Sequence, residues 1–136
     1  MMTLNYLLPE ALFAIYDEIS VLFCQRSNKK PNINIINTIF EGINVFQEYK
    51  KNYDVADIAA HLASSFLKEK PFYVHNKRMT LIATEVFLNI NGYNLNASDP
   101  FYVINIKDLE NHSMSEDEFA VWLRRHIQPK ENNSEE

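Results

Sequence analysis

Apolar residues recur at helical spacing along most of this chain. Between Pro9 and Phe23 they stand at positions 11, 12, 15, 16, 19, 22 and 23, which is one face of a helix, and Pro9 suits its first turn. From Ile33 to Phe46 the apolar steps are again three or four residues, which predicts a second helix although Gly42 and several β-branched residues lower its propensity. The polar run QRSNKKPN at 25–32 predicts a loop between them. The second helix is expected to bury Ile33, Ile36, Phe40, Ile43 and Phe46.

Two further helices are predicted on either side of Pro71, which ends the first of them. Asp54 suits the N-cap of the third helix. The fourth runs from about Asn76 to Asn89 and ends at Asn91-Gly92, a pair typical of helix C-caps. The faces expected in the core are Val55, Ile58, Ala59, Leu62, Ala63 and Phe66 in the third helix and Leu81, Ile82, Val86 and Phe87 in the fourth.

Capping residues mark two more helix starts. Ser98-Asp99-Pro100 opens a fifth helix that ends near Glu110, and Ser115 with Glu118 forms a capping box for a sixth. Past Gln128 the chain is expected to fray. The pattern therefore predicts an all-α fold, a compact bundle of about six short helices. The sixth helix is expected to bury Phe119, Trp122, Leu123 and Ile127.

The composition fits one globular domain, expected over residues 1–128, with a polar acidic tail at 129–136 that is expected to be disordered. The 136 residues are 46% hydrophobic and include only two glycines, which argues against all-β folds and Gly-rich phosphate loops. A net charge of −5 argues against a general nucleic-acid binder. The single cysteine, Cys24, lies in an apolar run, where it is expected in the core and forms no internal disulfide.

The sequence also points to a cytoplasmic protein, or to one delivered to a host cytosol if it is an effector. It contains no apolar stretch of about 18 residues, the length that a membrane-spanning helix needs. It contains no charged n-region followed by an apolar segment, the pattern of a secretory signal. Neither a membrane partner nor a standard secretion route is expected.

The candidate chemistry lies in the stretch KPFYVHNKR at 70–78, where a loop gives way to the fourth helix. A helix start presents unpaired N–H groups and the positive end of the helix dipole. Asn76, Lys77 and Arg78 would add to these a phosphate-sized site, and Lys68 and Lys70 bring more positive charge. The competing interpretation is a solvated first turn, since a Lys-Arg pair is ordinary on protein surfaces.

Other residues of this stretch have structural as well as functional interpretations. Phe72 is expected to anchor the loop in the core, and Tyr73 either packs or turns its hydroxyl to the cleft. His75 is a general base, a phosphate donor or a plain polar loop residue. His61 lies within the third helix with its exposure undecided. No motif predicts a transition-metal site.

The stretch from Pro71 to Leu95, PFYVHNKRMTLIATEVFLNINGYNL, resembles the Fic/Doc family, and within it the Doc (death-on-curing) toxins. The family pattern reads His-Pro-Phe-x-Asp-Gly-Asn-Lys-Arg-Thr-Ala, followed by a helix with Phe-Leu and an Asn-Gly end. The matching residues are Pro71, Phe72, Asn76, Lys77, Arg78, Phe87, Leu88, Asn91 and Gly92.

The resemblance implies a helical domain with a nucleotide cleft at this loop. Family members transfer part of a nucleotide, usually AMP, to a protein hydroxyl. Doc-type members, which have Lys in place of the second motif glycine as at Lys77, resemble kinases that phosphorylate a translation factor. They are paired with an antitoxin whose tail packs in a groove. The implied ligand is ATP, and the implied protein partner is an antitoxin-like peptide or a target protein.

Three departures from the family pattern bear on activity. Lys70 stands where the family has its general-base histidine, and an ammonium is a poor base near neutrality unless burial lowers its pKa. Val74 replaces the acid that holds Mg²⁺, so no metal is expected. His75 replaces a glycine, and its Cβ is expected to restrict φ and crowd the phosphates.

Three functional hypotheses remain open. The first, which the departures favour, is a Doc-like toxin–antitoxin-family protein with an impaired transfer site, a pseudoenzyme. The second is a re-purposed protein-modifying kinase or nucleotidyl- or glycosyl-type transferase that uses Lys70 or His75 as its base. The third is a non-catalytic interaction module, an effector or an inhibitor, and an exposed apolar groove would favour it.

Overall fold

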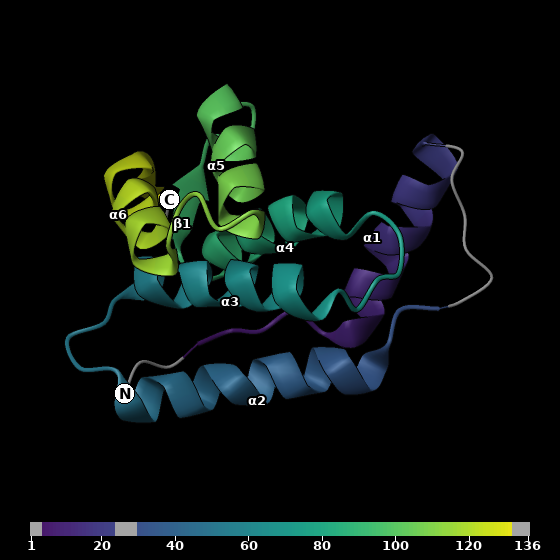
Figure 1. Cartoon of the computed structure of the whole chain (residues 1–136), viewed down its shortest axis with the longest axis horizontal. Helices are drawn as coiled ribbons and strands as arrows, with labels where there is room; N and C mark the ends of the chain where they lie inside the picture. Colours follow the sequence, from purple (N-terminus) through teal and green to yellow (C-terminus); the bar gives the residue numbers. More distant parts are fainter. Residues whose placement is uncertain (1–3, 24–29, 132–136) are drawn as a thin grey trace, which may run out of the picture.

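The computed structural model describes residues 4–23 and 30–131, and in this part the chain forms six α-helices and one two-stranded sheet (Figure 1). The predicted all-α fold is confirmed, since the sheet is small and the helices pack around a common core. The elements are α1 (Pro9–Leu22), α2 (Ile33–Tyr49), α3 (Val55–Glu69), α4 (Asn76–Ile90), β1 (Tyr93–Leu95), α5 (Pro100–Glu110), α6 (Glu116–His126) and β2 (Ile127–Pro129).

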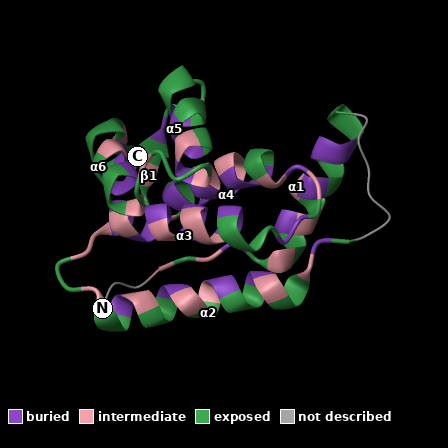
Figure 2. Ribbon diagram, viewed as in Figure 1, coloured by how far each residue is buried: buried purple, intermediate pink, exposed green. Residues whose placement is uncertain are grey.

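The third helix is the centre of the fold. It packs against α2, α4, α5 and α6, and Figure 1 shows it running between α2 on one side and the α4–α6 group on the other. Figure 2 shows buried residues in successive turns along its length. Small side chains let neighbouring helix backbones approach closely, and α3 carries four fully buried ones. These are Ala56, Ala59, Ala60 and Ala63.

Local capping fixes the helix starts that the sequence predicts. Asp54 and Ser115 each form a capping box, with Asp57 and Glu118 respectively. Asp99 caps α5 by accepting a hydrogen bond from the N–H of Phe101. Each cap satisfies N–H groups that a helix start otherwise leaves unpaired.

The chain end differs from the expectation. The strand β2 pairs antiparallel with β1, with Leu95 opposite Ile127 and Tyr93 opposite Pro129, and the N–H of Lys130 donates to the carbonyl of Gly92 at 2.9 Å. Fraying therefore does not begin at Gln128, because backbone hydrogen bonds hold the two following residues. Residues 132–136 of the predicted tail and Cys24 lie outside the described residues.

The predicted core faces are correct in part. In α2, Ile36 and Ile43 are fully buried, but Ile33 at the helix start is exposed. In α4 the predicted positions Leu81, Ile82 and Val86 are only half-buried. The face that turns to the core is Met79, Thr80, Ala83, Thr84, Phe87 and Leu88. None of the described helices is long and apolar enough to cross a membrane.

Candidate functional site

The loop from α3 to α4 is the candidate site, and its path depends on three left-handed residues. Lys70, which caps the C-terminus of α3, has φ 49°, Tyr73 has φ 62° and His75 has φ 61°. Phe72 anchors the loop as predicted, since it is fully buried with its ring centroid 6.0 Å from that of Tyr16 and 5.7 Å from that of Phe66. Tyr73 remains 45% exposed.

The Asn76 side chain holds the loop together. Its Oδ1 accepts a hydrogen bond from the N–H of Phe72 at 3.0 Å, which closes the turn at the start of α4. On the other side of the loop, the N–H of Asn32 donates to the carbonyl of Pro71 at 2.8 Å and ties the loop to the start of α2. The amide oxygen of Asn76 is therefore used within the loop.

Two lysines meet at one carboxylate beside this turn. Lys77 Nζ lies 3.2 Å from Glu110 Oε1, and Lys70 Nζ lies 3.9 Å from Glu110 Oε2. The three side chains come from the start of α4, the end of α3 and the end of α5. Lys70 and Lys77 keep 59% and 46% exposure, whereas Glu110 keeps 27%. The structure thus brings two cations together where one anion already lies.

Arg78 belongs to a different cluster. Its guanidinium carbon lies 3.9 Å from the ring centroid of Phe23, a cation–π contact with the end of α1. Its Nη1 lies 3.1 Å from Nδ1 of His75. Because a guanidinium only donates, Nδ1 accepts in this pair and a neutral His75 carries its proton on Nε2. The adjacent residues Asn76, Lys77 and Arg78 therefore serve three separate sets of contacts.

The Fic/Doc pattern has a general base at position 70 and a metal-binding acid at position 74, and the residues found there, Lys70 and Val74, are placed for neither role. A lysine needs burial to act as a base near neutrality, and Lys70 is mostly exposed beside a carboxylate. Val74 is half-buried and packs against the core. Among the described residues, no three His, Cys, Asp or Glu side chains are grouped so that they could hold a metal ion.

His75 departs from expectation. Its Cβ does not keep the backbone from the left-handed region, because φ is 61° and the residue caps α4 there. The side chain makes no capping hydrogen bond to the first turn of α4. The ring is 8% exposed and contacts the rings of Tyr16 and Phe23. A buried imidazole therefore replaces the open nest that a glycine would give.

Sequence reasoning missed three residues of the site. Glu110 pairs with both lysines, and Phe23 makes a cation–π contact with Arg78. Tyr16 packs against Phe72 of the loop, and burial raises the pKa of its hydroxyl. All three are distant from the loop in sequence, and no local pattern marks them. The helix end at Glu110 was predicted, but its position beside Lys70 and Lys77 depends on how α5 packs.

Comparison with known proteins adds no relative. No protein-family model matches the sequence, and no curated protein matches it. The resemblance to the Fic/Doc family therefore remains a prediction that rests on the loop and the helix after it.

Proposed function

We propose that the protein is a Doc-like member of the toxin–antitoxin class whose loop and α4 start bind a phosphate-bearing ligand without carrying out the usual transfer. The observation that carries this proposal is the convergence of Lys70 and Lys77 on the carboxylate of Glu110. Glu110 stands in for an external anion, since phosphate and carboxylate oxygens are alike in charge and in their need for N–H donors. The helix dipole of α4 adds positive potential at the same point.

The lost chemistry follows from two neighbouring positions. Lys70 is mostly exposed and so lacks the burial that a lysine needs to serve as a general base, and removing a positioned base commonly costs about 10²–10⁴ in rate. The isopropyl group of Val74 cannot hold the cation that would bridge phosphates. ATP is the nucleotide that this proposal implies, bound without a requirement for Mg²⁺. A re-purposed transferase would need a base other than Lys70.

Calorimetric titration with ATP, with and without Mg²⁺, tests the proposal. The test variant is Lys70→Gln with Lys77→Gln, and the control is Lys51→Gln with Arg125→Gln, which removes the same charge from exposed positions elsewhere. We expect saturable binding to the wild type that Mg²⁺ changes little, and about tenfold weaker binding to the test variant, because each exposed contact contributes up to about 1 kcal/mol. Equal affinity of the two variants would contradict the site.

A separate observation favours the interaction module as a second candidate. An apolar groove of about 340 Å³ lies between α1, α4 and α5, and it is lined mainly by apolar side chains. At its edge Leu22 and Phe23 remain 72% and 51% exposed, so they extend the apolar surface of the groove, as on a contact surface. Failure of the wild type to bind ATP would favour this function, with an antitoxin-like peptide or a target protein as the partner.

A further inference from the structure

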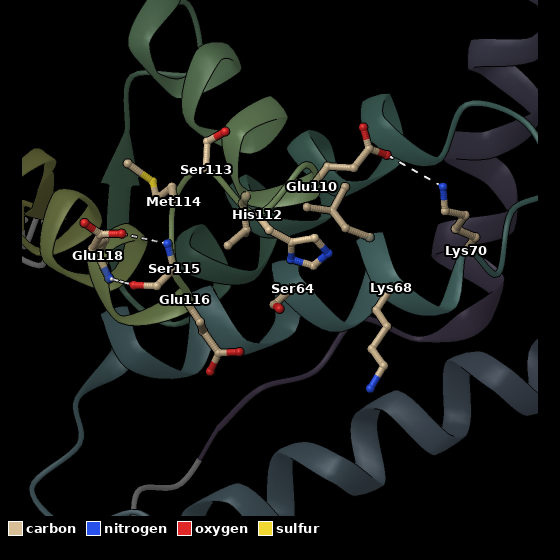
Figure 3. A pocket seen from close by; sticks show the side chains of 12 residues that line it. Ser64, Lys68, Lys70, Glu110, His112, Ser113, Met114, Ser115, Glu116 and Glu118 are labelled. Atoms are coloured by element: carbon tan, nitrogen blue, oxygen red, sulfur yellow. Dashed lines mark hydrogen bonds and ion pairs between the residues drawn. The ribbon is translucent and has the colours of Figure 1, made fainter.

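A second cavity lies between α3 and the turn that joins α5 to α6 (Figure 3). Its volume is about 670 Å³, within the range of about 300–1,000 Å³ that is usual for small-molecule sites. Its apolar surface comes from Leu67, Leu109 and Met114, of which the two leucines are buried. It therefore combines an apolar floor with a polar rim, the combination that small ligands require.

The charges on the rim are separated. Lys68 and Lys70 line the cavity from the end of α3, and Glu116 and Glu118 line it from the start of α6. Figure 3 shows Lys68 and Lys70 on one side, with Glu110, which also lines the cavity, beside Lys70. Glu116 and Glu118 lie on the other side, and His112 lies between the two groups. A ligand that spans the cavity meets positive charge at one end and negative charge at the other.

Existing contacts show which charges remain available to a ligand. Lys70 shares Glu110 with Lys77, and Glu118 accepts from the N–H of Ser115 in the capping box. Glu116 uses Oε2 for His61 Nδ1, at 3.0 Å, which leaves its other oxygen. Lys68 forms no ion pair within the described part of the chain.

We propose that this cavity binds a small zwitterion whose ammonium and carboxylate are separated by an apolar spacer. The ammonium lies against Glu116, the carboxylate against Lys68 and the imidazole N–H of His112, and the spacer covers Leu67 and Met114. A simple anion would use only the lysine end of the cavity, and a simple cation would use only the Glu116 end. A zwitterion can pair with both ends, so the separated charges favour a zwitterion over a simple anion or a simple cation. The proposed contacts involve neither Lys77 nor the first turn of α4, but Lys70 and Glu110 line this cavity and also belong to the proposed phosphate site.

Three compounds with the same spacer test the charge requirement. The probes are 6-aminohexanoate, hexanoate, which lacks the ammonium, and hexylamine, which lacks the carboxylate. Binding is followed on protein with ¹³C-labelled methionine methyl groups, because Met114 lines the cavity and the fully buried Met79 in α4 is an internal control. We expect 6-aminohexanoate to shift the Met114 signal saturably, with each single-charge analogue about fivefold weaker.

Single substitutions then test which residue binds each end of the ligand. Lys68→Gln is expected to weaken 6-aminohexanoate about fivefold, and Glu116→Gln to do the same while leaving hexanoate unchanged. The matched controls are Lys51→Gln and Asp117→Asn, since Asp117 is next to Glu116 but pairs with Lys50 and does not line the cavity. Hexanoate binding as tightly as 6-aminohexanoate would overturn the proposal, as would no movement of Met114 with any probe. Equal loss in the controls would overturn it too.

Discussion

Three residues of the loop before α4, Lys70, Tyr73 and His75, adopt left-handed backbone conformations that residues other than glycine seldom take. A non-glycine residue in the left-handed region costs of order 1 kcal/mol and persists only where its surroundings over-determine it. Here the buried Phe72 and the hydrogen bond from its N–H to Asn76 provide that constraint. His75 is the most informative of the three left-handed residues, because the Fic/Doc pattern that the loop resembles has glycine at this position and His75 adopts a glycine-like φ of 61°.

Glycine and alanine at position 75 should therefore reverse their usual order of stability. Both His75→Ala and His75→Gly lose the packing of a ring that is 8% exposed, but only Gly accepts the left-handed φ without a Cβ penalty. We expect His75→Gly to be about 1 kcal/mol more stable than His75→Ala in urea unfolding.

The control for this comparison is Glu85 inside α4, where ordinary helical geometry should make Ala more stable than Gly by about 0.5–1 kcal/mol. If Ala were the more stable residue at both positions, a left-handed His75 would be ruled out.

Among the ion pairs of the described residues, the shortest joins α6 to the start of α3. Arg124 Nε lies 2.7 Å from Asp54 Oδ2, and Arg124 Nη2 lies 3.0 Å from Asp57 Oδ1. The two acids are also the capping box of α3, so one guanidinium holds the charges that cap that helix. The hydrogen bond from Arg124 is the main cause that lowers the pKa of Asp54 from 3.8 to about 2.

This shift predicts how stability depends on pH. A carboxyl whose pKa is lower in the folded state than in the unfolded state stabilises the protein at any pH above its unfolded-state pKa. That contribution is lost as the pH falls through its folded-state pKa. The window is therefore from pH 3.8 down to about 2. Because both side chains are more than 40% exposed, the contribution is discounted to about 1 kcal/mol. Arg124→Gln should lose that much at pH 7 and show a flatter profile within the window, as measured by urea unfolding at a series of pH values.

The neighbouring Arg125→Gln provides the control for the pH series. Arg125 is exposed on the same helix turn, and its replacement removes the same charge without touching Asp54 or Asp57. Its profile should follow the wild type. If the free energy of unfolding of Arg124→Gln changed with pH as steeply as that of the wild type, the contact of Arg124 with Asp54 and Asp57 would not set the acid sensitivity.

Local signals account for the elements that the sequence predicted, and distant contacts account for those it did not. The helix starts after Asp54 and Ser115 follow from short capping patterns within a few residues. The pairing of β1 with β2 joins segments separated by two helices, and nothing within either three-residue strand specifies it. Of the predicted α4 face, Phe87 is buried but Leu81, Ile82 and Val86 are only half-buried. The core-facing side includes Thr80, a polar residue that can be buried because its hydroxyl donates to the carbonyl of Asn76.

For the candidate site too, local sequence predicted the loop, whereas distant contacts decide which of its side chains meet. The sequence placed Lys70 and Lys77 in one loop, but their convergence depends on Glu110 and thus on how α5 packs. The separation of Arg78 from Lys77 depends on Phe23 at the end of α1. Tertiary packing decides which of several adjacent polar side chains meet, and sequence adjacency does not.

At the scale of the whole molecule, a chain with net charge −5 keeps cations beside the loop by pairing them with its own carboxylate. The ends of α3 and α5 and the start of α4 meet through Lys70, Glu110 and Lys77. Such a contact stabilises the fold modestly, since exposed pairs contribute about 0–1 kcal/mol. It also competes with any external anion, so stability and anion binding are opposed at this point.

Glu110→Gln separates the two effects. It removes the internal anion while keeping the size of the side chain, so the ammonium groups of Lys70 and Lys77 become available to solution anions. We expect inorganic phosphate to bind about fivefold more tightly, with the gain shrinking as ionic strength rises, and the free energy of unfolding without phosphate to fall by about 0.5 kcal/mol. Titration calorimetry at two salt concentrations measures the phosphate affinity, and urea unfolding measures the stability.

Asp117→Asn makes the same change of net charge at a remote ion pair, so a general electrostatic effect would raise phosphate affinity in both variants. Tighter binding in Glu110→Gln alone locates the anion site at the lysine pair, whereas unchanged or weaker binding there would mean that the carboxylate does not compete for it.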